Sequence, residues 1–170
     1  MNNILSLDLS TKASGWAIKI DNVLYSGCVQ SSSTDVYKRI SVIKNGILEI
    51  VKKYNPTKVI IEEVRPDINN SHTHKMLFYI QAVIVISIYE YNKNIEFDFI
   101  LPNSWRSKIG IKTGAGIKRE ALKAKDILYV KQKYDIIVGD DEADAIGILD
   151  SYDVINTDKS SFNSGGFSLI

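Results

Sequence analysis

The sequence has a single cysteine, three prolines and no apolar run long enough to cross a membrane. Because Cys28 is alone, the chain can form no internal disulfide and no thiolate-based zinc site, which favours a reducing compartment. The uncharged apolar segment Met76 to Tyr89 has fourteen residues, fewer than the roughly 18 that a spanning helix needs. The first residues enter a strand-like run without the features of a signal peptide. We therefore expect a cytoplasmic protein with no membrane partner.

An excess of charge of one sign is also lacking, since the formal net charge is only +1. Bulk electrostatics therefore does not point to nucleic acid. The basic residues are nevertheless unevenly placed: between Pro102 and Tyr134 there are nine Lys or Arg residues, and the only acids are Glu120 and Asp126. This segment predicts a surface for a polyanion, although a solvated helix face would have the same composition.

The length and composition predict one α/β domain. A chain of 170 residues with 45% apolar residues can build one core over residues 1–155, followed by a flexible tail, 156–170, rich in Ser, Asn and Gly. Period-two runs predict strands, and apolar residues at three- and four-residue spacing predict helices. The predicted strands span 4–9, 15–20, 23–29, 58–62 and 97–101. The predicted helices span 36–54, 76–91, 118–134 and 141–152.

Four acidic residues stand where buried runs end or a helix begins. They are Asp8, Glu62, Asp141 and Asp144. A carboxylate in a buried run is costly unless it is ligated or paired, and aspartates three residues apart share one face of a helix. If the two strands are neighbours beside the last helix, the four side chains meet, and clustered carboxylates repel unless a divalent cation lies among them. This pattern predicts two Mg²⁺ ions about 4 Å apart and metal-dependent phosphodiester cleavage.

Each of these acids also has a purely structural interpretation. Asp8 could begin a turn, Glu62 could end a solvated strand, and Asp141 could stabilise a helix N-terminus electrostatically. Taken singly, the structural interpretation is the simpler one for each residue. Taken jointly, the acids fit one site on one fold, which favours the metal site.

Three segments carry a resemblance to a known family. They are Leu7-Asp8-Leu9-Ser10 with Gly15-Trp16-Ala17, Ile61-Glu62-Glu63-Val64, and Asp141-Glu142-Ala143-Asp144-Ala145-Ile146. Over nearly its whole length the chain resembles the RuvC-type Holliday junction resolvases of the RNase H-like superfamily. The resemblance implies an RNase H-like fold, with a mixed five-stranded sheet and helices on both faces. It also gives Asp8, Glu62, Asp141 and Asp144 the role of ligands for Mg²⁺, with Mn²⁺ as a substitute.

The resemblance further implies branched DNA as the partner. The residues expected at the DNA are Trp105, Arg106, Lys108, Lys112, Lys118 and Arg119, with Lys118 also expected to act in catalysis. They would bind phosphates and stabilise negative charge in the transition state. The helix over residues 75–91 corresponds to the element through which these resolvases dimerise, so we expect a homodimer on a two-fold symmetric four-way junction. Ser10, where the bacterial enzymes have a proline-glycine turn, and the additional acids Asp140 and Glu142 fit a divergent, phage-type member.

The expected activity is the resolution of Holliday junctions by paired symmetric nicks, each leaving a 5′-phosphate and a 3′-hydroxyl. Four alternatives stay open from the sequence. They are a branched-DNA nuclease that also cuts three-way junctions, flaps or forks, an RNase H-type enzyme acting on hybrids, a non-catalytic junction-binding module, and one lobe of an actin-like or sugar-kinase-like ATPase. The length disfavours the ATPase, which needs two such lobes, and the presence of all four acids disfavours the non-catalytic module.

Overall fold

The computed structural model describes residues 3–64 and 71–163 of the chain. Five strands form one sheet in the order β3-β2-β1-β4-β5. The strands are β1 (Ile4–Asp8), β2 (Ala13–Ile20), β3 (Val23–Gln30), β4 (Lys58–Glu62) and β5 (Glu96–Ile100). The helices are α1 (Val36–Tyr54), α2 (Ser71–Tyr91), α3 (Pro102–Lys108), α4 (Arg119–Tyr134) and α5 (Asp140–Asn163).

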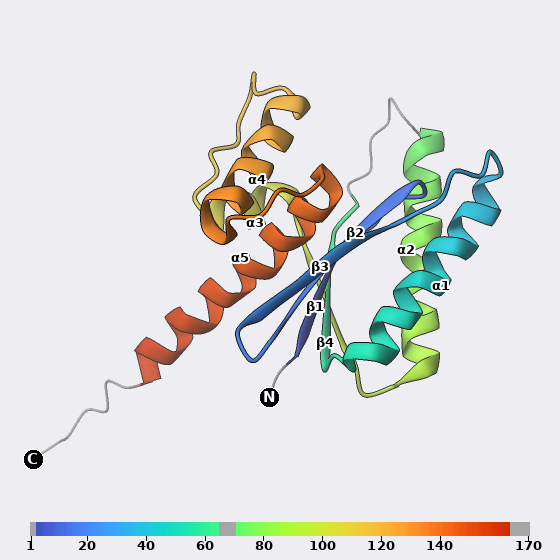
Figure 1. Ribbon diagram of the computed structural model, residues 1–170, viewed down its shortest axis with the longest axis horizontal. Coiled ribbons are helices and arrows are strands. Elements are labelled where there is room, and N and C mark those ends of the chain that lie inside the picture. The colour runs from blue at the N-terminus through green and yellow to red at the C-terminus, as the bar shows by residue number, and fades with distance from the viewer. Residues whose placement is uncertain (1–2, 65–70, 164–170) are drawn as a thin grey trace, which may run out of the picture.

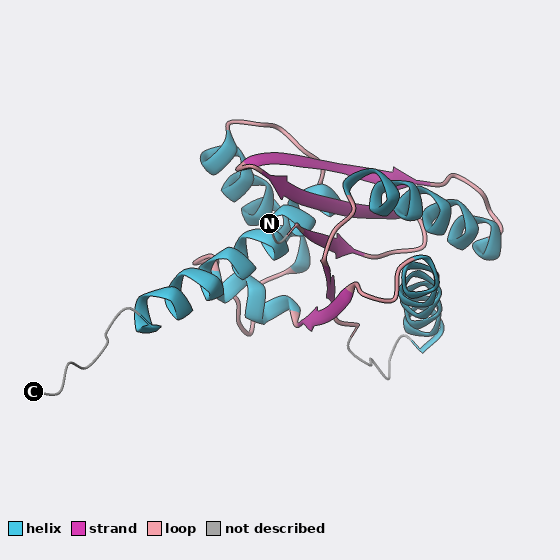
Figure 2. Cartoon of the chain, turned by 90° about the horizontal axis from the view of Figure 1, so that it is seen from below, coloured by secondary structure: helices cyan, strands magenta, loops and turns pink. Residues whose placement is uncertain are grey.

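The sheet is mixed, as the sequence predicted. Strands β1, β2 and β3 form an antiparallel meander, and β4 pairs parallel to both β1 and β5. Helices α1 and α2 cover one face, whereas α3, α4 and α5 lie on the other (Figure 1). Viewed from below, the sheet lies between these two helical layers (Figure 2). The predicted α/β fold with helices on both faces is confirmed.

Successive side chains of the central strands point to opposite faces of the sheet and so contribute to two separate hydrophobic cores. Leu5 and Leu7 of β1 are fully buried in the cluster that includes residues of α1 and α2, and Ser6 between them faces the opposite side because successive strand residues alternate. Helix α2 contributes Ile80, Ile84 and Ile88, which are fully buried at four-residue spacing. On the other face, Ser6 Oγ lies 2.7 Å from the carbonyl oxygen of Ala145, so α5 lies directly over β1.

Three features differ from the predicted elements. Helix α2 begins at Ser71, five residues before the predicted start at residue 76. The seven-residue helix α3 was not predicted, because Pro102 was interpreted only as the end of a strand; in the structure Pro102 occupies the first turn of α3, where its missing N–H leaves no hydrogen bond unmade. Helix α5 continues to Asn163, past residue 152, so the predicted end of this helix was wrong. The predicted tail, 156–170, therefore begins inside α5, and residues 164–170 lie outside the described part of the chain.

None of the helices described here is both long enough and apolar enough to cross a membrane.

Candidate metal and DNA site

The strand geometry brings two of the predicted acids together. Asp8 is the last residue of β1 and Glu62 the last of β4, and the parallel pairing of Leu7 with Ile61 places them side by side. Because side chains alternate, Asp8 shares the face of Ser6 and Glu62 shares the face of Ile60. Ile60 packs with Ile148 of α5, so both acids point to the side of the sheet that α5 covers.

Helix α5 supplies the other two acids from its first turns. Asp141 and Asp144 lie three residues apart and so share one helix face. The helix reaches the sheet closely because Gly15 of β2 has no side chain: a Cβ there would lie 1.8 Å from the carbonyl oxygen of Asp141. Gly15 is also the residue opposite Asp8 in the β1–β2 pair. The four acids, Asp8, Glu62, Asp141 and Asp144, are called the carboxylate site below.

The electrostatics of the carboxylate site disfavour ionised acids in the absence of a cation. Burial, followed by the charges of Glu62 and Asp141, raises the pKa of Asp8 well above its usual value. Burial raises the pKa of Glu62 as well, and burial together with the charge of Asp8 raises the pKa of Asp144 to about 9. Like charges out of water destabilise one another, and a divalent cation would reverse that effect.

Helix α3 places an indole and a guanidinium against this site. Trp105 is fully buried, and its Nε1 donates a 2.6 Å hydrogen bond to Glu62 Oε2. Arg106 is 7% exposed and pairs with Asp126 of α4 through Nε and Nη2; its Nη2 also lies 3.3 Å from Asp144 Oδ1. Trp105 and Arg106 were predicted to contact DNA. The structure contradicts this prediction, because both side chains are buried and contact acids.

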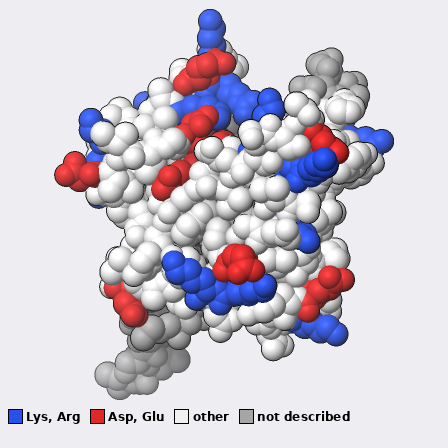
Figure 3. Space-filling model, turned by 45° about the vertical axis from the view of Figure 1, so that its right-hand side comes forward, with Lys and Arg blue, Asp and Glu red and all other residues white. Residues whose placement is uncertain are grey.

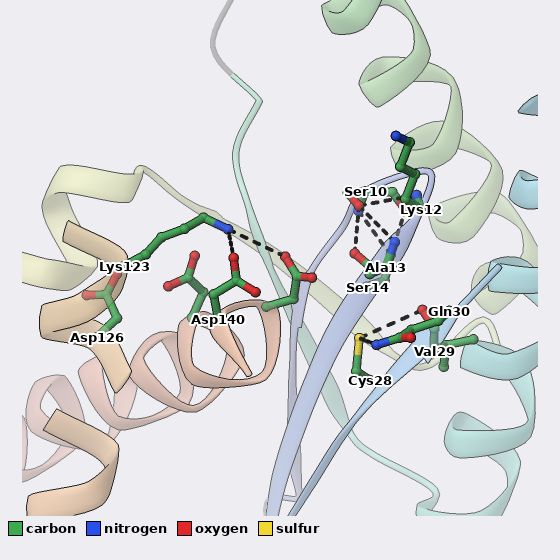
Figure 4. A network of polar contacts seen from close by, with 12 residues as sticks. Ser10, Lys12, Ala13, Ser14, Cys28, Val29, Gln30, Lys123, Asp126 and Asp140 are labelled. Carbon is green, nitrogen blue, oxygen red and sulfur yellow. Dashed lines mark hydrogen bonds and ion pairs between the residues drawn. The ribbon is translucent and has the colours of Figure 1, made fainter. Parts of the chain in front are cut away.

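One basic residue that the sequence analysis missed enters the site from α4. Lys123 pairs with Asp140, and its Nζ lies 3.9 Å from Asp141 Oδ1; Figure 4 shows Lys123 extended toward Asp140 of α5. A signal was present, because Arg119, Lys123 and Asp126 recur at four- and three-residue spacing and so share one face of α4. The second additional acid, Glu142, accepts a hydrogen bond from Ser26 Oγ.

The remaining basic candidates lie on the surface. Lys108, Lys112, Lys118 and Arg119 are all exposed. Lys118 is the N-cap residue of α4. Burial raises the pKa of both Glu62 and Asp141, and the charge of Arg119 partly opposes this rise. Arg119 therefore lies close to the carboxylate site. Among the described residues no contact joins Lys118 to the four acids, so the structure gives no support for its predicted catalytic role.

The described residues contain no group of three or more His, Cys, Asp or Glu side chains close enough together to hold a metal ion. Two of the four acids are held apart from the others by their own partners: Glu62 accepts a hydrogen bond from Trp105, and Asp144 forms an ion pair with Arg106. The donor set nevertheless suits a hard cation, which prefers carboxylate oxygens. Asp144 Oδ1 is buried and accepts no hydrogen bond in the described part of the chain, so it is available as a ligand.

The loop after β1 is held rigidly at the same end of the sheet. The hydroxyl of Ser10 lies 2.6 Å from the carbonyl oxygen of Ala13, and the amide of Ser10 donates to Ser14 Oγ; Figure 4 shows this network. Arg39 of α1 donates to the carbonyl of Thr11. The turn that departs from the family pattern is therefore stabilised by serine hydroxyls in place of a proline and a glycine.

Comparison with known proteins agrees with this geometry. The family model of crossover junction endodeoxyribonuclease RuvC matches residues 4–149. RuvC of Rickettsia conorii is 28% identical over 152 residues, which cover 85% of this chain and 92% of the relative. The structure resembles that of Thermus thermophilus RuvC in complex with a Holliday junction substrate, with a TM-score of 0.72 and 12% identity over 92% of this chain and 96% of the other. The yeast mitochondrial Holliday junction resolvase matches with a TM-score of 0.62 and 13% identity, over 96% of this chain and 82% of the other.

Proposed function

The chain belongs to the crossover junction endodeoxyribonuclease RuvC family, and on that basis we propose that it resolves four-way DNA junctions by metal-dependent hydrolysis at the carboxylate site. The single observation that supports this most strongly is the arrival of Asp8 and Glu62 from adjacent parallel strands beneath the first turns of α5. An enzyme that hydrolyses DNA phosphodiester bonds needs such a set of acids on a rigid scaffold.

The metal in this proposal is Mg²⁺, with Mn²⁺ as a substitute, and its ligands are the four acids of the carboxylate site. When bound, the cation supplies Lewis acidity, which makes water a better nucleophile and stabilises the charge of the phosphate. The protein side chains hold and orient the ligands: Trp105 fixes Glu62 by its hydrogen bond, and Gly15 lets α5 approach β2 closely enough to bring Asp141 to the site.

The DNA would lie across the exposed basic residues near the carboxylate site. Lys108, Lys112, Lys118 and Arg119 would contact phosphates and position the strand without reading its bases. Lys123 lies 3.9 Å from Asp141, so it is the cation best placed to reach the phosphate under attack. We propose Lys123 for the charge-stabilising role that the sequence analysis gave to Lys118, and we retain Lys118 as a phosphate contact.

A homodimer through α2 would give the enzyme two sites for the two strands of a junction. Large apolar side chains on this helix are exposed, among them Phe78, Val83 and Ile86. Beside them is a cavity of about 430 Å³ lined by Phe78, Val85 and Phe99 together with Glu63, Val64, Gln81 and Ala82. The side of the molecule that Figure 3 brings forward carries few charged side chains at its centre and more around its rim. Exposed apolar surface rimmed by charge is typical of a protein interface, and a two-fold axis matches the symmetry of the substrate.

The test is cleavage of a synthetic four-way junction with Mg²⁺, beside matched linear duplex and three-way substrates. Wild-type protein should make paired symmetric nicks with 5′-phosphate ends, and Asp8→Asn and Asp144→Asn should bind the junction without cutting it. Equal cleavage of the three-way substrate would instead assign a broader branched-DNA specificity. Junction binding without cleavage in either metal would contradict the proposed hydrolysis.

A further inference from the structure

Arg106 is held by an acid that is not one of the proposed metal ligands. Its Nε lies 3.2 Å from Asp126 Oδ1 and its Nη2 lies 2.9 Å from Asp126 Oδ2, and the two side chains are 8% and 0% exposed. Two parallel N–H donors on one carboxylate form the strongest geometry available to this pair. Asp126 therefore occupies the Nε and Nη2 side of the guanidinium and fixes the orientation of the whole group.

The same guanidinium forms an ion pair with the proposed ligand Asp144 but makes no hydrogen bond to its buried oxygen. Nη2 lies 3.3 Å from Asp144 Oδ1, and yet Oδ1 is the one buried side-chain nitrogen or oxygen without a hydrogen-bond partner among the described residues. A guanidinium free to turn would satisfy this oxygen, because an orphaned buried acceptor is costly. The pairing with Asp126 is what prevents that turn.

We propose that Asp126 is a positioning residue which sequesters Arg106, so that Asp144 keeps an oxygen free for the metal ion. The proposal rests on the function proposed above, since it concerns the affinity of that site for its cation. Without Asp126, Arg106 would form a bidentate pair with Asp144 and compete with the metal for the same oxygen. With Asp126, the positive charge beside the ligand is neutralised by an acid outside the four proposed ligands.

A second cation at the site is restrained in the same way. Lys123 is bound by Asp140, which precedes the proposed ligand Asp141, and its Nζ is left 3.9 Å from Asp141 Oδ1. Each proposed ligand on α5 thus faces a cation that is already engaged by another acid. The same arrangement occurs in two pairs, Arg106 with Asp126 and Lys123 with Asp140. This repetition supports a role for Asp126 and Asp140 in keeping ligand oxygens available.

The experiment measures the affinity of the purified full chain for Mn²⁺ alone, from the electron paramagnetic resonance signal of the free ion, without DNA. Asp126→Asn should weaken Mn²⁺ binding by at least about tenfold, the usual effect of losing a residue behind a metal ligand. The double variant Arg106→Met/Asp126→Leu removes the competitor together with its partner, and apolar replacement of a buried pair is tolerated by many folds. It should bind Mn²⁺ within about threefold of wild type.

Lys19→Met is the matched control, because it breaks another ion pair, between the partly exposed Lys19 and the buried Asp150 of α5, outside the carboxylate site. It should lower the melting temperature and leave Mn²⁺ affinity unchanged. If Asp126→Asn does not fold, Asp126→Glu takes its place, since the longer side chain displaces the carboxylate from Arg106; weaker Mn²⁺ binding is expected there too.

Three results with the variants would overturn the inference. The first is unchanged Mn²⁺ affinity in Asp126→Asn or in Asp126→Glu. The second is Mn²⁺ binding by the double variant as weak as that of Asp126→Asn, which would make Arg106 itself necessary. The third is an equal loss of Mn²⁺ affinity in Lys19→Met. A wild-type chain that binds no Mn²⁺ would overturn the proposed metal site as well as the inference. Tight binding by wild type and Asp126→Asn alike would overturn the inference alone.

Discussion

The indole Nε1 of Trp105 donates a 2.6 Å hydrogen bond to Oε2 of Glu62, across 43 residues of sequence. The donor lies on the short helix α3 and the acceptor at the end of β4. The indole ring is itself fixed, because Gly147 of α5 leaves room for it: a Cβ at that position would lie 2.4 Å from the ring. The position of Glu62 thus depends on contacts made by both α3 and α5.

Trp105→Phe should keep most of the ring packing and remove this donor. A buried hydrogen bond to a charged group contributes about 1.5–3 kcal/mol, so we expect a loss of that size in the free energy of unfolding. Junction cleavage should fall by roughly tenfold or more, since Glu62 is no longer oriented. Urea denaturation and a cleavage time course measure the two effects. Trp16→Phe is the control, because Trp16 packs against Tyr54 on the α1 side of the sheet; equal cleavage losses in both variants would argue against an orienting role.

Gly15→Ala should disturb the approach of α5 to the sheet. Its Cβ would lie 1.8 Å from the carbonyl oxygen of Asp141, so the first turn of α5 must shift. Overpacking of this kind costs on the order of 1–3 kcal/mol, and a displacement of about 1 Å at a catalytic group can cost 100-fold in rate. Gly139→Ala is the matched control, because nothing lies within 4 Å of a Cβ at that position. Full cleavage by Gly15→Ala would show that the site tolerates movement of α5.

The fold was largely predictable because its signals are local. Strand alternation and the four-residue spacing of Ile80, Ile84 and Ile88 follow from burial of one face, and β4 was recognised from its β-branched run. Helix α3 was missed because seven residues are too few to display a helical period. The end of α5 was misplaced because the polar residues beyond Tyr152 resemble a tail in composition.

The acids of the carboxylate site were found because an acid ending a buried strand is conspicuous in sequence. Their partners were not, since the contacts of Trp105 with Glu62 and of Lys123 with Asp140 join separate elements. A basic segment shows where positive charge is concentrated but not which side chains are buried. Trp105 and Arg106 were therefore assigned to the DNA, although the packing of α3 turns them inward.

Lys118→Ala should weaken junction binding through the loss of one phosphate contact. Each such contact releases counterions, so the slope of log affinity against log salt concentration should become shallower by about one unit. Stability should be unchanged, because the side chain is exposed. Fluorescence anisotropy over a salt series measures the slope. Lys93→Ala should keep the wild-type slope, because Lys93 precedes β5 and so lies at the end of the strands opposite Glu62. An unaltered slope in Lys118→Ala would remove Lys118 from the DNA contacts.

Ile86→Glu should dissociate the proposed dimer. Ile86 is 55% exposed on α2, and burying an unpaired carboxylate in an interface is strongly unfavourable, so the dimer dissociation constant should rise by at least about 100-fold. Light scattering coupled to size-exclusion chromatography measures the molar mass. Val42→Glu introduces the same charge on the exposed side of α1 and should leave the dimer intact. Dissociation by both variants, or by neither, would place the interface elsewhere.

Asp150 ties α5 to the rest of the molecule far from the carboxylate site. It is buried and accepts hydrogen bonds from Lys19 at 2.6 Å, Tyr134 at 2.6 Å and Tyr129 at 2.9 Å. Burial alone would raise the pKa of Asp150, but the bonds from Lys19 and Tyr134 outweigh it and hold the pKa below its usual value. Burial and the bond to Asp150 raise the pKa of Tyr134 to about 12, so this phenol remains a donor at neutral pH.

The depressed pKa makes the contribution of Asp150 to stability dependent on pH. An aspartate whose pKa is lower in the folded than in the unfolded state stabilises the fold above the unfolded value of about 3.9, and this stability is lost as pH falls through the folded pKa. Asp150→Asn should therefore be less stable than wild type by roughly 1.5–3 kcal/mol at pH 7, because Lys19 keeps only its other partner, Asp153. The difference should narrow at pH 3, which lies below the unfolded pKa of about 3.9, because the carboxyl of the unfolded wild-type chain is then largely protonated. Urea denaturation of both proteins at the two pH values measures it, and an equal difference at both would show that Asp150 acts through packing rather than through its charge.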